Sequence, residues 1–425
     1  MRPFPPSRPL LSLASAASSL LRLPSSRPPH RALGSLPYRI RAPLAKLQAK
    51  KALPAPSAAP GTLGDGEALE QPDAAPDYLR LALTSRVYDY VEATPLVHAG
   101  GLSDRLRAVV HLKREDLNPS YSFYIRGAYA KLADLKAKGC AGVIVVSIGS
   151  RGHAVGVAAR RLGLAATVVM PVHTPHSRAA AVARSGATVV RHGGSMSEAQ
   201  AHAEAMAAEG GLYLVRAHDD PLVIAGNATV GMEISRQHGA ALKLLRPAAS
   251  AHHLDAVFVP VGGGSLLAGV AAALKQISPS TKIIAVEPEA VDVMRRSLLS
   301  GHCVKIAEPG AEGIWVKQLG EEIFRICDEL VDDVVTVSDS EIAQAIRDVF
   351  EDTRALLEPA GAISVAGLTK WKRCEGASLS GGNFVAIASD ACNIEFDFLK
   401  EFASEATNGA TFVRIGDRLG TRPSA

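Results

Sequence analysis

The first 64 residues of this 425-residue chain contain no aspartate or glutamate, although they carry seven arginines and three lysines. A segment rich in Arg, Ser, Pro, Leu and Ala and poor in acids is typical of a mitochondrial or chloroplast transit peptide. Prolines recur through it and interrupt any long amphipathic helix, which favours a plastid presequence over a mitochondrial one. We therefore expect residues 1–60 to be a cleavable transit peptide, with a disordered tail or a wrongly assigned start as the alternative. A secretory signal fits less well, because Arg22 interrupts the apolar run 10–23.

Several other patterns are scarce or absent. Aromatic residues make up only 5% of the chain, so the core must consist mostly of Ala, Val, Leu and Ile. The five cysteines form no CxxC pair, which argues against structural zinc and a disulfide framework and favours a reducing compartment. No stretch reaches the roughly 18 apolar residues that suggest a membrane-spanning helix. Beyond residue 64 there are 36 basic and 42 acidic side chains, and this mild acidity does not indicate binding to nucleic acid or to anionic membranes.

From about residue 77 onward, short β-branched segments alternate with alanine-rich segments of helical length. This alternation predicts an α/β fold of βαβ units around parallel sheets flanked by helices, with strands covered on both faces. The predicted strands are 142–147, 166–170, 187–191, 255–261, 282–287, 333–337 and 383–389. The predicted helices are 153–162, 175–185, 195–208, 221–237, 265–276, 339–352 and 394–402. Residues 61–76 are interpreted as a linker between the leader and this region.

The strongest candidate site is the turn after the predicted strand 255–261. Gly262, Gly263 and Gly264 run through Ser265 and Leu266 directly into a predicted helix. Glycines let backbone N–H groups converge on an anion, and a helix N-terminus adds positive potential, so this turn predicts a phosphate cradle. It does not match the GxxxxGK[ST] pattern, so ATP hydrolysis is not indicated. A purely structural glycine turn is the alternative.

Two further strand-to-helix turns are candidates, because ligands of open α/β sheets bind beyond the carboxyl ends of the strands. Residues 148–156 follow one predicted strand and contain His153, which could contact a ligand or equally well cap a helix or lie on the surface. Ser389 ends the predicted strand 383–389, where its hydroxyl could bind a ring nitrogen. Serine at a strand end is common, so this signal is weak by itself.

Together with segments 111–117 and 122–128, these turns resemble the pyridoxal-phosphate enzymes of fold type II, and most closely the plant biosynthetic threonine dehydratases. The resemblance covers about residues 80–405. It includes further motifs in the family's order, at 168–171, 230–234, 286–288 and 358–362. The family implies a two-lobed fold like that of tryptophan synthase β, formed by residues 77–405, with the smaller lobe at about 120–215 inserted in the larger.

The resemblance also implies a function. Family members deaminate L-threonine, or L-serine, to 2-oxobutanoate, or pyruvate, and ammonia, and in plants this reaction begins isoleucine synthesis in plastids. Pyridoxal 5'-phosphate is the implied cofactor; its phosphate is expected on residues 262–266, and its ring nitrogen is expected to face Ser389. A small amino acid is the expected partner, together with other subunits in a homo- or hetero-oligomer. Residues 406–425 read as a tail, without the regulatory domain of the isoleucine-sensitive enzyme.

Three positions depart from the family's motifs. In the family's motif Ser-Phe-Lys-x-Arg-Gly-Ala, this chain has Phe123 at the phenylalanine and Tyr124 in place of the lysine. A phenol can neither form the imine that the lysine forms nor act as a good base at neutral pH. Gly152 stands where the family has an asparagine that touches the cofactor ring, in a turn about two residues longer. The last turn contains Asp390 and one extra residue, and a carboxylate there is expected to weaken binding of a phosphate cofactor.

A neighbouring lysine is not expected to replace the missing one. Lys131 lies roughly 10 Å along a helix from position 124, and Lys113 corresponds to a lysine that the family already has. The departures therefore predict a threonine dehydratase relative whose catalysis is lost or much reduced. The alternatives are a pyridoxal-phosphate enzyme with an unusual base, and a non-catalytic subunit that modulates active family members.

Overall fold

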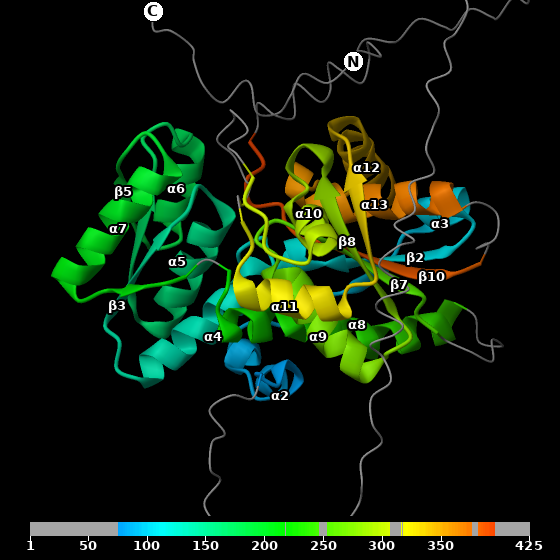
Figure 1. Ribbon diagram of the computed structural model, residues 1–425, viewed down its shortest axis with the longest axis horizontal. Helices are drawn as coiled ribbons and strands as arrows, with labels where there is room; N and C mark the ends of the chain where they lie inside the picture. Colours follow the sequence, from blue (N-terminus) through cyan, green and yellow to red (C-terminus); the bar gives the residue numbers. More distant parts are fainter. Residues whose placement is uncertain are drawn as a thin grey trace, which may run out of the picture. The chain divides into compact units, whose positions relative to one another are not determined.

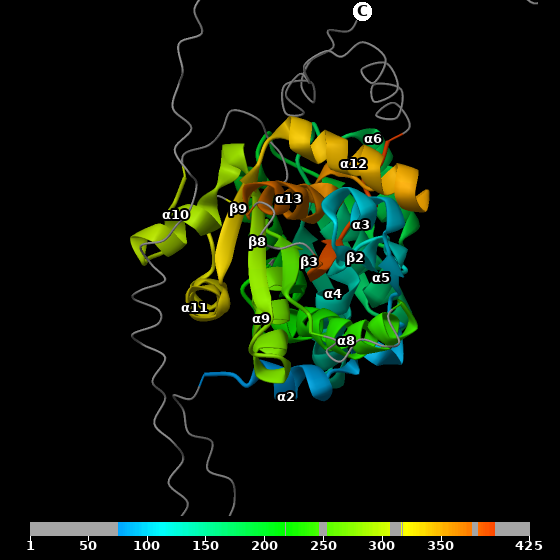
Figure 2. The same cartoon turned by 90° about the vertical axis from the view of Figure 1, so that its right-hand side faces the viewer.

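A computed structural model describes residues 75–216, 218–245, 253–306, 316, 318–375 and 381–395. The expected transit peptide 1–60, nearly all of the linker 61–76 and the tail 406–425 lie outside these residues. The described part contains two sheets with helices on their faces (Figures 1 and 2). Its helices are α2 (Tyr78–Leu83), α3 (Gly100–Leu106), α4 (Tyr124–Ala137), α5 (Ser150–Leu162), α6 (His176–Arg184), α7 (Met196–Gly210), α8 (Pro221–Leu245), α9 (Ser265–Ile277), α10 (Val293–Ser300), α11 (Glu321–Leu330), α12 (Asp339–Thr353) and α13 (Pro359–Glu375).

The larger sheet has six strands in the order β1-β2-β10-β7-β8-β9. Its strands are β1 (Leu96–His98), β2 (Val109–Arg114), β7 (Ala256–Pro260), β8 (Lys282–Pro288), β9 (Asp333–Val337) and β10 (Asn383–Ala388). All neighbours pair in parallel except β1 and β2, which are antiparallel. Strand β10, the last of the described strands, lies between β2 and β7 and so brings the carboxyl end of the described chain to the middle of the sheet.

The smaller sheet has four parallel strands in the order β5-β4-β3-β6. They are β3 (Gly142–Val146), β4 (Ala165–Met170), β5 (Thr188–Arg191) and β6 (Tyr213–Leu214). Short 3-10 turns at Arg86–Asp89, Glu115–Leu117 and Glu289–Val291 connect other elements. The predicted α/β class with parallel sheets is therefore confirmed.

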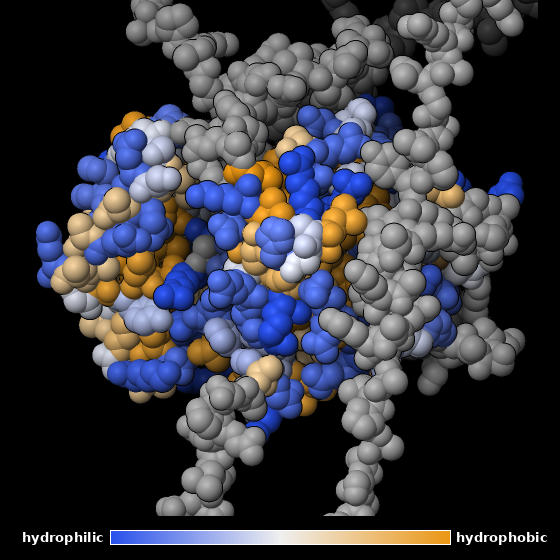
Figure 3. All heavy atoms as spheres, in the orientation of Figure 1, coloured by the Kyte–Doolittle hydropathy of each residue, from blue (hydrophilic) through white to orange (hydrophobic). Residues whose placement is uncertain are grey.

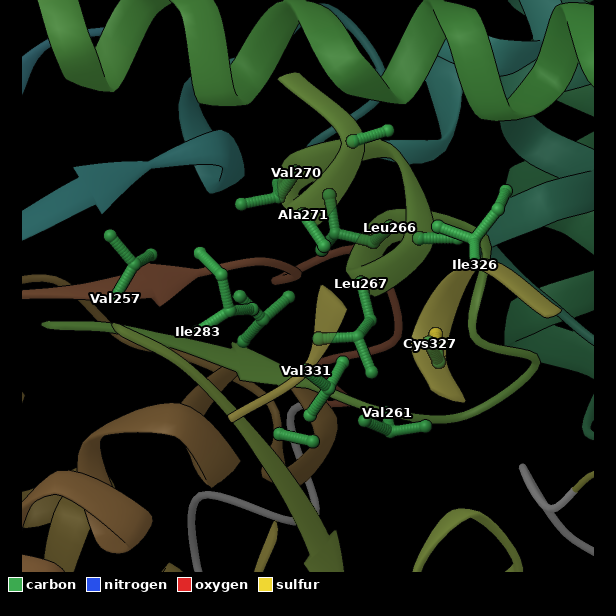
Figure 4. Close-up of a cluster of buried hydrophobic side chains, with 14 of the residues drawn as sticks. Val257, Val261, Leu266, Leu267, Val270, Ala271, Ile283, Ile326, Cys327 and Val331 are labelled. Carbon is green, nitrogen blue, oxygen red and sulfur yellow. The ribbon is translucent and has the colours of Figure 1, made fainter. Parts of the chain in front are cut away.

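Alternating side chains of the large sheet supply two separate cores. Val257, Ile283 and Val385 pack with α8, α9 and α11, whereas Phe258, Ile284 and Phe384 face the opposite side and pack with α12 and α13. Figure 4 shows the first core, where Val257 and Ile283 approach the apolar side chains of α9. A strand places successive side chains on opposite faces, so burial of both faces explains the continuous apolar runs in the sequence.

Glycines allow three helices to pack closely beneath the sheet. A Cβ on Gly226 of α8 would lie 2.6 Å from the carbonyl oxygen of Arg126 in α4. A Cβ on Gly269 of α9 would lie 2.6 Å from the carbonyl oxygen of Ile224 in α8. Contacts shorter than 3 Å would force the backbones apart, so α4, α8 and α9 depend on these glycines for their spacing.

Most predicted elements are found, with local differences. Helix α5 begins at Ser150 instead of residue 153, and α8 continues to Leu245 instead of ending at 237. The helix predicted at 394–402 is not supported at its first two residues, which are irregular, and its remainder lies outside the described residues. On the face drawn in Figure 3, hydrophilic and hydrophobic residues are interspersed over the coloured part. No helix in the described ranges is both long and apolar enough to cross a membrane.

Acid is expected to destabilise the protein through His111 of β2. Its side chain is only 1% exposed, neither ring nitrogen has a hydrogen-bond partner within the described ranges, and the rings of His98 and His238 lie 5.5 and 6.1 Å away. Burial, together with the charges of His238 and His98, lowers the pKa of His111 to about 4. The unfolded chain, in which the histidine pKa is about 6.5, then binds more protons than the folded one, so stability is complete above pH 6.5 and decreases towards pH 4.

The expected loss is about 3 kcal/mol of unfolding free energy between pH 7 and pH 4. Urea unfolding at a series of pH values measures it, with His111→Phe as the variant that removes the titrating ring. The exposed His302 provides the control variant His302→Gln. The decrease of the unfolding free energy with falling pH should become shallower in His111→Phe only. Equal pH dependence in the natural protein and both variants would contradict the role of His111.

Candidate active site

One cavity of about 580 Å³ lies where the candidate turns meet. The turns after β3, β7 and β10 all contribute to its wall, together with Phe123 and Tyr124 at the start of α4. Both sheets therefore present the carboxyl ends of their strands to the same cavity, as expected for ligand sites in parallel sheets. Of the predicted site residues, this wall contains Phe123, Tyr124, Gly262, Gly263, Gly264, Ser265, Leu266 and Ser389.

Tyr124 is the first residue of α4 and lies in the cavity wall. Its ring stacks on that of Phe123 with centroids 4.2 Å apart, and its backbone N–H donates to the Ser122 hydroxyl at 3.4 Å. Burial raises the pKa of the Tyr124 phenol to about 12; Arg151 opposes this shift, and the carboxyl groups of Asp390 and Glu358 add to it. The side chain at this position is therefore a neutral phenol at physiological pH.

No lysine occurs among the described residues that line the cavity. The Lys131 ammonium forms an ion pair with Asp220 at 2.7 Å, so it is already engaged elsewhere. The Lys113 ammonium is buried and donates to Glu233 at 2.5 Å and to the carbonyl oxygen of Thr94 at 2.7 Å. Neither amine is among the described residues of the cavity wall.

The glycine turn has the backbone of an anion cradle. Gly264 has a φ of +86°, in the left-handed region that favours glycine, and a Cβ there would lie 2.6 Å from Ile323. The turn leads directly into the 13-residue helix α9, whose N-terminal N–H groups and dipole favour a phosphate. Ser265 accepts a hydrogen bond from the Asn227 amide at 3.2 Å, and buried Leu266 anchors the turn in the core. These residues fit the phosphate of the family's cofactor.

The second turn differs from its sequence-based interpretation. Gly152 lies inside the first turns of α5, donates its N–H to the Ser147 hydroxyl at 2.9 Å, and is not part of the cavity wall. A Cβ on it would lie 2.9 Å from Val168. The two residues before it, Ser150 and Arg151, reach the cavity instead. Glycine at 152 thus serves packing against the small sheet.

Arg151 is a cavity residue that the sequence did not single out. Its guanidinium donates to the carbonyl oxygen of Val146 and to Nε2 of His218 at 3.1 Å, whereas its Nε has no partner within the described ranges. Burial lowers the pKa of His218 to about 3, and the charge of Arg151 contributes to this shift. The ring is therefore neutral and can accept this bond. A cationic group therefore faces the cavity beside the cradle.

His153 does not belong to the cavity wall. Its ring stacks on Tyr121 with centroids 6.2 Å apart, and burial lowers its pKa. Of the three roles considered from the sequence, which were ligand contact, a helix cap and a surface position, direct ligand contact is not supported by its position.

The third turn holds a pair of buried carboxyl groups. Ser389 donates from its hydroxyl to the carbonyl oxygen of Ala360 at 3.3 Å, and the next residue, Asp390, is 3% exposed. Glu358, the residue before α13, is 4% exposed and accepts a bond from the backbone N–H of Asn393 at 2.7 Å. Burial raises the pKa of both carboxyl groups, and the charge of Glu358 raises that of Asp390 further.

An ion cluster that joins α4 to α8 and to the end of β2 holds α4 in place. Arg126 is fully buried and donates to Glu115 at 2.6 Å and to Glu233 at 2.6 Å, and Lys113 also pairs with Glu233. Burial raises the pKa of Glu115, but Arg126 outweighs that effect and holds it below its ordinary value. Because Arg126 lies two residues after Tyr124, this cluster positions the residue that faces the cavity.

The fold and the cradle define a protein built to bind a phosphate-bearing ligand where the carboxyl ends of strands from two sheets meet. Residues 87–390 match the family described as pyridoxal-phosphate dependent enzyme, and the chain belongs to this family. Within it, the chain is a member of the fold type II threonine dehydratase group. The family's cofactor is pyridoxal phosphate.

Three relatives illustrate the similarity. The chloroplastic biosynthetic threonine dehydratase 1 of Solanum lycopersicum is 46% identical over 76% of this chain and 52% of its own length. The mitochondrial threonine dehydratase of Schizosaccharomyces pombe is 41% identical over 80% of this chain and 55% of its own length. The structure of the processed form of threonine deaminase isoform 2 from Solanum lycopersicum matches with a TM-score of 0.70 and 40% identity over 77% of this chain and 92% of that one. The chain spans little more than half the length of these curated dehydratases.

Proposed function

We propose that this chain retains the threonine dehydratase fold and its phosphate cradle but deaminates threonine and serine slowly or not at all. The observation that carries this proposal is Tyr124 in the cavity wall, with no lysine among the described lining residues. The family's cofactor supplies an aldehyde that must condense with an amine. The cradle fits the phosphate of that cofactor, but the described wall offers no amine to its aldehyde.

The changes at the other two turns support the same proposal. Arg151 brings a cation beside the cradle, and Asp390 adds a second buried carboxyl group next to Glu358. In an active site, displacements of about 1 Å can cost roughly 100-fold in rate. Two changed turns and Tyr124 around one cavity therefore make efficient turnover by the family's route unfavourable.

The purified full chain is expected to release no ammonia and no 2-oxoacid from L-threonine or L-serine when pyridoxal phosphate is added in excess. The reason is the absence of both the imine-forming amine and the proton-transferring base that one lysine provides in the family. A keto-acid assay with lactate dehydrogenase and NADH measures the product, and a family member that keeps the lysine serves as the positive control. Turnover within about tenfold of that control would refute the proposal and favour an enzyme with an unusual base.

We also propose that the basic leader directs the protein to a plastid or a mitochondrion. The support is its composition, together with the names of the relatives, which are chloroplastic in tomato and mitochondrial in fission yeast. Residues 1–75 fused to a fluorescent protein would test this in plant cells. Fluorescence spread through the cytosol would contradict the proposal, and the compartment that is labelled would choose between the two organelles.

A further inference from the structure

The two turns that depart from the family's motifs contact each other at the cavity wall. In Figure 1 the smaller sheet, with α5 and α6, lies to the left of the larger sheet. The turn after β3 leads into α5 at Ser150, and the turn after β10 contains Asp390 and Asn393. All three residues line the cavity. Contacts among them therefore join the two sheets at the cavity itself.

These contacts form one chain of hydrogen bonds. Asn393 donates from its side-chain amide to the Ser150 hydroxyl at 2.7 Å, and the same hydroxyl bonds the carboxyl group of Asp390. The backbone N–H of Asn393 donates to Glu358 at 2.7 Å. A hydroxyl can accept and donate at once, so Ser150 links the amide to the carboxyl group. We call Ser150, Glu358, Asp390 and Asn393 the clasp.

The two turns also approach each other closely beside the clasp. A Cβ on Gly149 would overlap the side-chain amide of Asn393, so only glycine leaves room for this approach. A further link lies near the clasp, where Arg178 of α6 forms an ion pair with Glu395 at 3.1 Å. Burial raises the pKa of Glu358, and the charge of Arg178 opposes that shift. The described contacts thus hold α5 and α6 against the segment that follows β10.

Burial makes the links of the clasp depend on one another. Ser150, Glu358 and Asp390 are only 5%, 4% and 3% exposed. A buried polar group that loses its partner carries the full cost of its removal from water, because water cannot replace the lost bond. Breaking one link therefore destabilises the closed arrangement as a whole.

We propose that the clasp holds the second turn against the third and fixes the width of the cavity without the help of a ligand. Ser150 belongs to the lengthened second turn, and Asp390 to the altered third turn, so the two departures from the family form a single unit. Separate roles would stabilise each turn by itself, whereas the clasp makes both turns open together. This inference does not depend on whether the chain deaminates amino acids.

Amide hydrogen exchange of the purified full chain, followed by mass spectrometry of its peptides, tests the clasp. In the third turn the N–H groups of Ala391 and Asn393 have partners other than Ser150. We nevertheless expect Ser150→Ala to raise their exchange rates about tenfold, because a lost buried hydrogen bond costs about the 1.4 kcal/mol that corresponds to this factor. Rates are compared with those of β8 in the same sample, so that a loss of overall stability is not counted.

The opposite substitution should act on the second turn. Asp390→Ala should raise the exchange rates of Gly152 and His153 by a similar factor, although their N–H groups bond within the second turn. The double variant with Ser150→Ala should exceed either single variant by less than about threefold, because both changes break the same chain of bonds. Ser177→Ala, at an exposed position of α6, is the matched control and should change neither turn.

Gly149→Ala tests the clasp while keeping all of its side chains. The added Cβ would displace the Asn393 amide from Ser150, so exchange should become faster in both turns. Gly194→Ala is the matched control, because nothing lies within 4 Å of a Cβ at that position.

Faster exchange only in the turn that carries the substitution would overturn the inference. Unchanged exchange in both turns, or effects that multiply in the double variant, would overturn it as well. If Asp390→Ala did not fold, Ser150→Ala and Gly149→Ala would decide the question by the same criterion. No cofactor or substrate is added, so the result is separate from the test of the proposed function.

Discussion

Arg126→Met is expected to lower the free energy of unfolding by about 3–5 kcal/mol, because it leaves buried carboxylates without their principal partner. Arg126 is 0% exposed and donates to both Glu115 and Glu233, and only Lys113 would remain as a counter-charge. A typical domain is stable by about 5–15 kcal/mol, so this loss is a large fraction of the total. Urea unfolding followed by circular dichroism gives the difference directly.

Two further variants identify the cause of this loss. Arg325→Met removes an arginine that is 42% exposed and pairs with Glu322 on the surface of α11, and it should cost less than about 1 kcal/mol. Combining Arg126→Met with Glu115→Gln removes one unpaired negative charge and should recover part of the stability. If the double variant were less stable than Arg126→Met alone, the destabilisation would come from lost packing rather than from buried charge.

Tyr124→Lys is expected to restore a covalent bond to pyridoxal phosphate but to leave turnover at least about 100-fold below that of an active relative. The new amine would lie in the cavity wall at the start of α4. Arg151, Asp390 and Glu358 affect the pKa of the phenol at this position, and they would act on the amine in the same way. A cation beside the cradle and an additional carboxyl group would still alter how the ligand is oriented. An absorbance band of the imine and the keto-acid assay measure the two effects separately.

The triple change tests this explanation. Replacing Tyr124 by lysine and Asp390 by glycine, together with removal of residues 150 and 151, should increase turnover well beyond Tyr124→Lys alone. Tyr124→Phe is the matched control, since it keeps the ring and should show neither the imine band nor turnover. Full activity from Tyr124→Lys by itself would show that the longer second turn and the acidic third turn have little effect on the chemistry.

The sheet strands could be predicted from the sequence because their physical cause is local. Strands such as β3 and β7 are buried on both faces, so they are continuous apolar runs, and the glycine turn after β7 is contiguous in the chain. The position of Tyr124 in the wall followed from a motif. These features require no knowledge of which strands are neighbours.

Apart from Asp390, which the last turn's motif placed near the cofactor, the charges of the cavity could not be predicted in this way. The two extra residues of the second turn were interpreted as a longer loop, but the chain absorbs them into the first turn of α5, and this places Arg151 in the cavity and Gly152 outside it. Asp390 and Glu358 are 32 positions apart and meet only because β10 returns to the middle of the large sheet. The ion cluster of Arg126 is likewise assembled by tertiary contacts.

Mass spectrometry after borohydride reduction tests the central claim most directly. The full chain is incubated with pyridoxal phosphate, reduced, digested and compared with a relative that keeps the lysine and with Tyr124→Lys. We expect stoichiometric modification of one lysine in both comparison proteins and of none in the natural chain. A single lysine of the natural chain modified to stoichiometry would contradict the claim that the protein has lost its imine chemistry.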